Sequence, residues 1–65
     1  MDADKVLEHL VRELQGEIAA KSTVVANGGV HSFEEYKFVC GQIRGLLLAK
    51  ETVESLLQRV LDNDE

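Results

Sequence analysis

The sequence predicts an all-α protein, an antiparallel two-helix hairpin that oligomerises or docks on a larger assembly. Three observations predict this fold. Two long segments carry apolar residues at helical spacing, a glycine-rich cluster separates them, and 65 residues are too few to bury a large core alone. The chain is therefore interpreted as one domain, residues 1–65, with helices at about 3–26 and 33–61.

The first segment, residues 3–26, places its apolar side chains in one broad stripe of a helical wheel. Lys21 interrupts the stripe, but its long stem can lie on apolar surface while the amine reaches water. This stripe supplies the first half of the predicted hairpin core: Leu7, Leu10, Val11, Leu14, Ile18 and Val25.

The connection between the two segments carries signals for a helix end and a helix start. Asn27-Gly28-Gly29 supplies residues that accept positive φ, as a helix C-terminus often requires. Ser32 and Glu35 form a capping box. In this arrangement the Ser32 hydroxyl accepts from the Glu35 N–H, and the Glu35 carboxylate reaches back to the Ser32 N–H. We therefore expect a helix to begin next to Ser32.

The second segment has no strong helix breaker until about Asp62, which predicts a helix roughly 40–45 Å long. Its heptad series runs from Tyr36 to Val60, and Lys50 is its only polar member. Such a series predicts coiled-coil-like packing on the first helix. The second half of the predicted core is Tyr36, Val39, Ile43, Leu46, Leu47, Val53 and Leu57.

The back of the second helix is also apolar, and a helix that is apolar on two sides requires partners on both. Gly41 and Gly45 each cost about 1 kcal/mol relative to alanine, and their i,i+4 spacing would let another backbone approach. The alternative is that both glycines are tolerated on a solvent-exposed face. The predicted partner interface is Phe38, Gly41, Gly45, Leu48, Ala49, Thr52, Leu56 and Val60.

The predicted register leaves the end of the second helix unpaired. A hairpin that turns near Gly29 places Asp4 opposite about Ser55, so residues 56–61 would project beyond the first helix. The acidic end, residues 62–65, is interpreted as solvated.

No catalytic residue, metal site or cofactor is predicted, and the chain is interpreted as a non-enzyme. His9 and His31 lack ligand spacing, and Cys40 is interpreted as a small buried hydrophobe. One hairpin cannot easily form the concave pocket of an enzyme. The net charge of −5 disfavours nucleic acid, and no apolar stretch approaches the ~20 residues of a membrane span.

Residues 34–46, EEYKFVCGQIRGL, resemble small helical proteins of tailed bacteriophages, particularly short-tailed ones, that are encoded among structural genes. The resemblance extends over about half the chain and implies a virion component or assembly accessory at the head–tail or portal region. The implied partners are further copies and portal or tail proteins, and the implied location is the virion, or the host cytoplasm during assembly. The positions that match are packing positions: Tyr36, Gly41, Ile43, Arg44, Gly45 and Leu46.

Two other functions remain open from the sequence. A dimeric helical hairpin that binds RNA would need Lys5, Arg12, Lys37 and Arg44 in one stripe across the dimer. Its affinity would then fall steeply with salt. An inhibitor of a host protein is the third possibility, but the acidic residues are spread along both helices.

Overall fold

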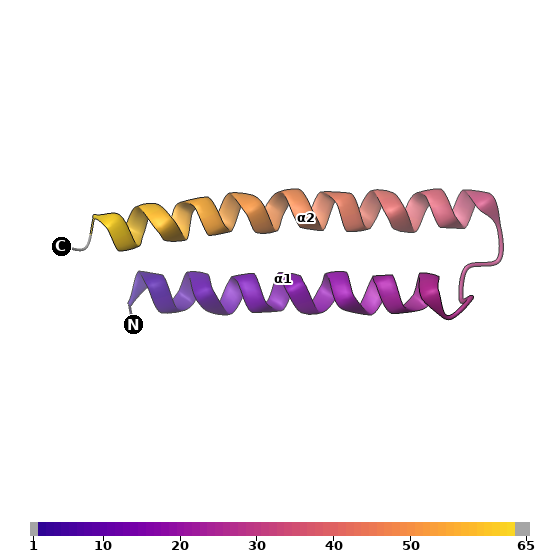
Figure 1. The fold of residues 1–65 in the computed structure, drawn as a ribbon, viewed down its shortest axis with the longest axis horizontal. Coiled ribbons are helices and arrows are strands. Elements are labelled where there is room, and N and C mark those ends of the chain that lie inside the picture. Colours follow the sequence, from indigo (N-terminus) through magenta and orange to yellow (C-terminus); the bar gives the residue numbers. More distant parts are fainter. Residues whose placement is uncertain (1, 64–65) are drawn as a thin grey trace.

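The computed structural model describes residues 2–63 and consists of two antiparallel helices, α1 (Ala3–Ala26) and α2 (Phe33–Asp62). They lie side by side along a rod of 51 × 16 × 14 Å (Figure 1). The predicted all-α hairpin is confirmed, and both helices begin and end within a residue of the predicted bounds. Asp64 and Glu65, half of the acidic end that was interpreted as solvated, lie outside the described residues.

A Schellman motif ends α1 at the two glycines. The Gly29 N–H donates to the Val24 carbonyl at 2.9 Å, and the Gly28 N–H donates to the Val25 carbonyl at 3.3 Å. Gly28 has φ of +74°, a conformation that side chains with a Cβ disfavour. A Cβ on Gly29 would lie 2.9 Å from Val24 Cγ1, so this position excludes a side chain through lack of space.

Two hydrogen bonds from backbone N–H groups to side chains cap the start of α2. The Ser32 hydroxyl accepts from the Glu35 N–H at 3.0 Å, as predicted. The Glu35 carboxylate, however, accepts from the N–H of His31 at 2.9 Å, and not from the predicted N–H of Ser32. The two bonds satisfy one donor of the first helical turn and one donor of the loop, and they fix the entry into α2.

Replacing Ser32 with alanine is expected to destabilise the hairpin by about 1 kcal/mol, because the Glu35 N–H loses its acceptor. Thermal unfolding followed by circular dichroism would show a melting temperature lower by roughly 4–8 °C. Ser55→Ala in the interior of α2 is the matched control and should leave the melting temperature unchanged or slightly higher. Equal shifts for the two variants would contradict the capping role.

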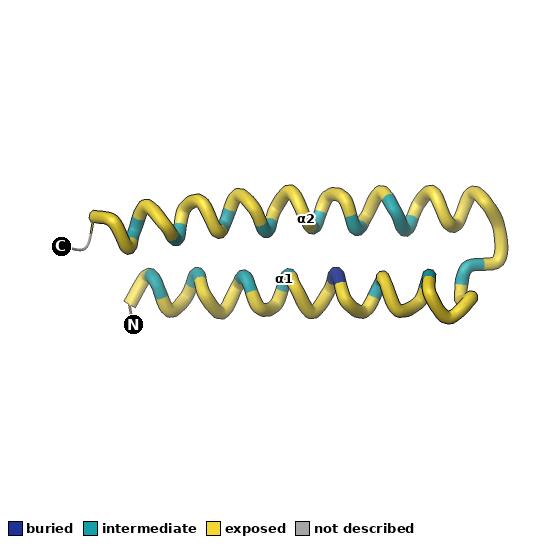
Figure 2. Tube along the Cα trace, viewed as in Figure 1, coloured by how far each residue is buried: buried dark blue, intermediate teal, exposed yellow. Residues whose placement is uncertain are grey.

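The core is a single seam between the helices. Residues that are buried or half-buried lie on the sides of α1 and α2 that face each other, and the outer sides are exposed (Figure 2). Ile18, at 7% exposure, is the only buried residue of the described range 2–63. The other predicted core residues at this seam are half-buried: Leu7, Val11, Leu14, Val25, Val39, Ile43, Leu46, Val53 and Leu57.

Two lysines lie in this seam, and both are half-buried. Lys21 is the predicted interruption of the α1 stripe, and Lys50 is the predicted polar member of the α2 series. The Lys50 Nζ lies 4.0 Å from the Glu54 Oε2, one turn further along α2. The stems of these lysines can cover apolar surface while the amines extend toward water.

Three predicted core residues are exposed instead: Leu10, Tyr36 and Leu47. Leu10 directly precedes the seam residue Val11, and Leu47 directly follows the seam residue Leu46. Both therefore lie at the side of the seam, where the facing helix covers them only in part. Tyr36 lies in the first turns of α2, which begin beyond the end of α1 (Figure 1). Its ring stacks against Phe33 on the same helix, with centroids 6.4 Å apart.

The predicted register is also wrong. Leu57 and Val60 are half-buried in the seam, as is Asp4 at the start of α1. Because α2 begins beyond the end of α1, most of its C-terminal part lies beside α1, and the free end of α2 is short (Figure 1). Val60, which was predicted for the partner interface, is therefore a seam residue, and within residues 2–63 the predicted long apolar overhang of residues 56–61 is not found.

Candidate interaction surface

The back of α2 is exposed and largely apolar. Phe38 and Leu48 are 66% and 54% exposed, and Leu56 is nearly half exposed. The remaining predicted interface positions on this helix, Gly41, Gly45, Ala49 and Thr52, are exposed as well. Large apolar side chains gathered on one side of a helix favour burial against a partner.

Thr52 adds little polarity to this side. Its hydroxyl donates to the Leu48 carbonyl of the preceding turn at 3.0 Å. The hydrogen-bonding need of the hydroxyl is therefore met within α2, as is common for threonine in a helix. A partner could cover Thr52 without leaving an unpaired donor.

The two glycines of α2 leave open space. A Cβ built on Gly41 or Gly45 would meet nothing within 4 Å. Packing inside the hairpin therefore does not require glycine at either position, although each weakens the helix by about 1 kcal/mol relative to alanine. Close approach of another chain would explain their presence.

A shallow hollow lies near the C-terminal end of the same side. Its volume is about 300 Å³, and it is lined by Thr52, Ser55, Leu56 and Arg59. All four residues belong to α2, so one helix alone borders the hollow and leaves it open to water. A protruding side chain of another protein could occupy such a site, whereas a small molecule would remain mostly exposed.

The heptad positions of the seam residues show which other sides of the two helices lie next to each other. Antiparallel helices that share a seam are related by an approximate two-fold axis normal to their common plane, so equivalent heptad positions lie on the same side of that plane. One side of the hairpin, which we call the shared face, therefore combines apolar or small residues of both helices. The apolar or small residues of the shared face are Val6, Leu10, Ala20 and Val24 from α1 and Phe38, Gly45, Ala49, Thr52 and Leu56 from α2, and the polar residues Glu13, Glu17, Gln42 and Arg59 lie on the same side.

The contribution of α1 to this surface was missed from the sequence. Val6, Leu10 and Val24 are each 41–46% exposed. A heptad assignment of α1 like the one made for α2 would have placed Leu10 and Val24 together, beside the seam. The opposite flank of α1 is polar at equivalent positions, with Glu8, Gln15 and Ser22.

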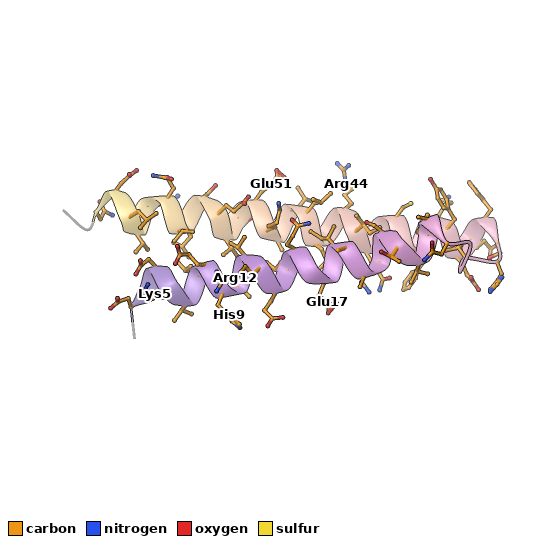
Figure 3. All side chains as sticks on the ribbon, turned by 60° about the horizontal axis from the view of Figure 1, so that its bottom comes forward. Lys5, His9, Arg12, Glu17, Arg44 and Glu51 are labelled. Carbon is orange, nitrogen blue, oxygen red and sulfur yellow. The ribbon has the colours of Figure 1, made fainter. Side chains whose placement is uncertain are left out.

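Charged side chains occupy the outer edges of the hairpin. Arg44 and Glu51 project from the side of α2 that faces away from α1, and His9 and Glu17 project from the opposite edge (Figure 3). His9 Nε2 lies 3.3 Å from Glu13 Oε1 within α1. The four side chains that project from these edges are exposed to solvent.

Few side chains in the described part of the chain could take part in catalysis or metal binding. The Cys40 thiol, one turn from Tyr36, raises the pKa of the Tyr36 phenol through a side-chain hydrogen bond and its charge when ionised. Tyr36 thus stays neutral near pH 7 and does not supply a base. Among residues 2–63, no three His, Cys, Asp or Glu side chains are grouped so that they could hold a metal ion.

Neither of the two described helices is long and apolar enough to cross a membrane. Comparisons with models of protein families, with curated proteins and with solved structures find no match for this chain.

Proposed function

We propose that this protein is a non-enzymatic interaction protein that packs in several copies on a larger protein assembly. The observation that carries the proposal is the exposed apolar back of α2, with Phe38 and Leu48 more than half exposed. A hairpin with one buried residue in its described part gains stability when another chain covers such a surface.

The assembly we propose is the head–tail or portal region of a tailed phage particle. The support for this is the resemblance of residues 34–46 to small phage structural-module proteins. Gly41 and Leu48 lie on the ridge of α2 that points away from the seam, where α1 cannot cover them. This outer ridge is the part of the surface that would contact the assembly.

Replacing Leu48 with glutamate is expected to abolish the association with the assembly, because burying a carboxylate without a partner is costly. The tagged protein would be expressed in cells that produce particles, and purified particles would be tested for it by mass spectrometry. The wild-type protein should be present in a fixed ratio to the portal and tail proteins. The Leu48→Glu protein should be absent from the particles but equally abundant in the cell extract.

Leu61→Glu is the matched control. Leu61 is also exposed on α2, but it lies on the other flank of the seam. This variant should remain with the particles. If both variants are lost from the particles, or if neither is lost, the outer ridge of α2 is not the docking surface. If the wild-type protein itself is absent from the particles, the proposed location is wrong.

A further inference from the structure

We infer that the shared face is covered by a second copy of this chain, so that two hairpins form a four-helix bundle. This inference rests on the proposed function, because it names the first partner that the interaction protein binds. The shared face and the outer ridge of α2 then serve different partners: the shared face serves the second copy, and the outer ridge serves the larger assembly.

The exposed area of the hairpin exceeds that of a compact protein of the same mass by about the area that one partner buries in a stable dimer. The chain exposes 4942 Å², whereas a compact protein of its 7.2 kDa mass would expose about 4,100 Å². The excess of about 800 Å² equals the area that each partner contributes to a typical stable interface.

The composition of the shared face selects a second hairpin over a single added helix. Helices of bundles carry apolar residues at the two seam positions and at one flanking position. Leu10 and Val24 occupy that flank on α1, and Ala49 and Leu56 occupy the same flank on α2. Because both helices have the same pattern on the same side, a copy related by two-fold symmetry presents a matching surface.

Small residues in the middle of the shared face allow close approach. Gly45 and Ala49 lie one turn apart on α2, and Ala20 lies on the same side of α1. The space around Gly45 is empty in the single hairpin. Larger side chains toward the ends, such as Phe38 and Leu56, would pack around this shallow centre.

Glu17 is a charged residue of this face, since it lies between Leu10 and Val24 on the same flank of α1. Its carboxylate projects from the edge of the hairpin (Figure 3). In a symmetric pair, the two copies of Glu17 would border the interface and add to the repulsion between two chains of charge −5 each. Glu17→Gln should therefore lower the dimer dissociation constant by about three- to tenfold, and added salt should strengthen the wild-type dimer.

Sedimentation equilibrium of the purified chain tests the inference directly. The expected mass is twice 7.2 kDa, and the melting temperature should rise with protein concentration. Leu56→Glu should raise the dissociation constant at least a hundredfold, as expected when an unpaired carboxylate is placed in an apolar interface. Leu48→Glu is the matched control on the outer ridge and should sediment as the wild-type protein does.

Gly45→Leu keeps the test decisive if Leu56→Glu unfolds. A leucine at this position meets open space in the single hairpin and favours the helix, so it should preserve helicity and abolish the dimer. Gly16→Leu, at an equally open position on the outer side of α1, should preserve both.

A wild-type protein that remains folded at 7.2 kDa at all concentrations overturns the inference, as does a Gly45→Leu protein that still dimerises. The proposed function is tested on purified particles and can fail separately. A dimer absent from particles contradicts the proposed function alone, and a monomer present on particles contradicts the dimer alone.

Discussion

Ile18→Ala is expected to remove most of the stability of the hairpin. Ile18 is the only buried residue in the described range, so no second layer compensates for the cavity that the substitution leaves. Loss of a buried isoleucine side chain costs about 2–5 kcal/mol. Proteins have roughly 0.05–0.15 kcal/mol of stability per residue, which gives about 3–10 kcal/mol for a chain of this length.

Urea unfolding followed by helical circular dichroism would measure this loss, at one fixed protein concentration because association adds to the apparent stability. The midpoint should fall strongly with little change in slope. Leu61→Ala, which shortens an exposed side chain on α2, is the control and should cost less than about 1 kcal/mol. Comparable losses for Ile18 and Leu61 would show that the seam is not the main source of stability.

Lys50→Leu is expected to act in the opposite direction and to stabilise the hairpin by about 1–2 kcal/mol. The side chain of Lys50 is only 22% exposed, and its amine has one carboxylate neighbour, Glu54, at 4.0 Å. A leucine would bury apolar area at the same place without keeping a charge near the seam. The melting temperature should rise by roughly 5–15 °C.

The same substitution should make association less specific. A single lysine within an apolar heptad series specifies register and the number of chains at a cost in stability. Sedimentation of Lys50→Leu should therefore show species larger than those of the wild-type protein. Lys5→Leu on the exposed outer side of α1 is the control, and an equal rise in melting temperature for both would contradict a role specific to the seam.

The sequence predicted only part of the candidate interaction surface. The exposed back of α2 was recognisable because Phe38, Leu48 and Leu56 repeat where a solvated helix would carry charge. Val6 and Val24 of α1 were missed because the broad apolar stripe of α1 was treated as one side of the helix. Separating the seam from its flanks requires the positions of both helices.

The sequence by itself determined the two helices, their ends and most residues of the seam. These features depend on local chemistry and on periodicity within one segment: the Ser32 cap, the Gly28-Gly29 ending and the three-and-four spacing of apolar residues. Only the tertiary structure decided the register, which returned Val60 to the seam and left Tyr36 exposed.

The physical reason lies in the loop. A change of a few residues in where α2 begins shifts every cross-helix pair, yet it alters no local preference in either helix. For the same reason, the shared face is defined only when the relative placement of α1 and α2 is known.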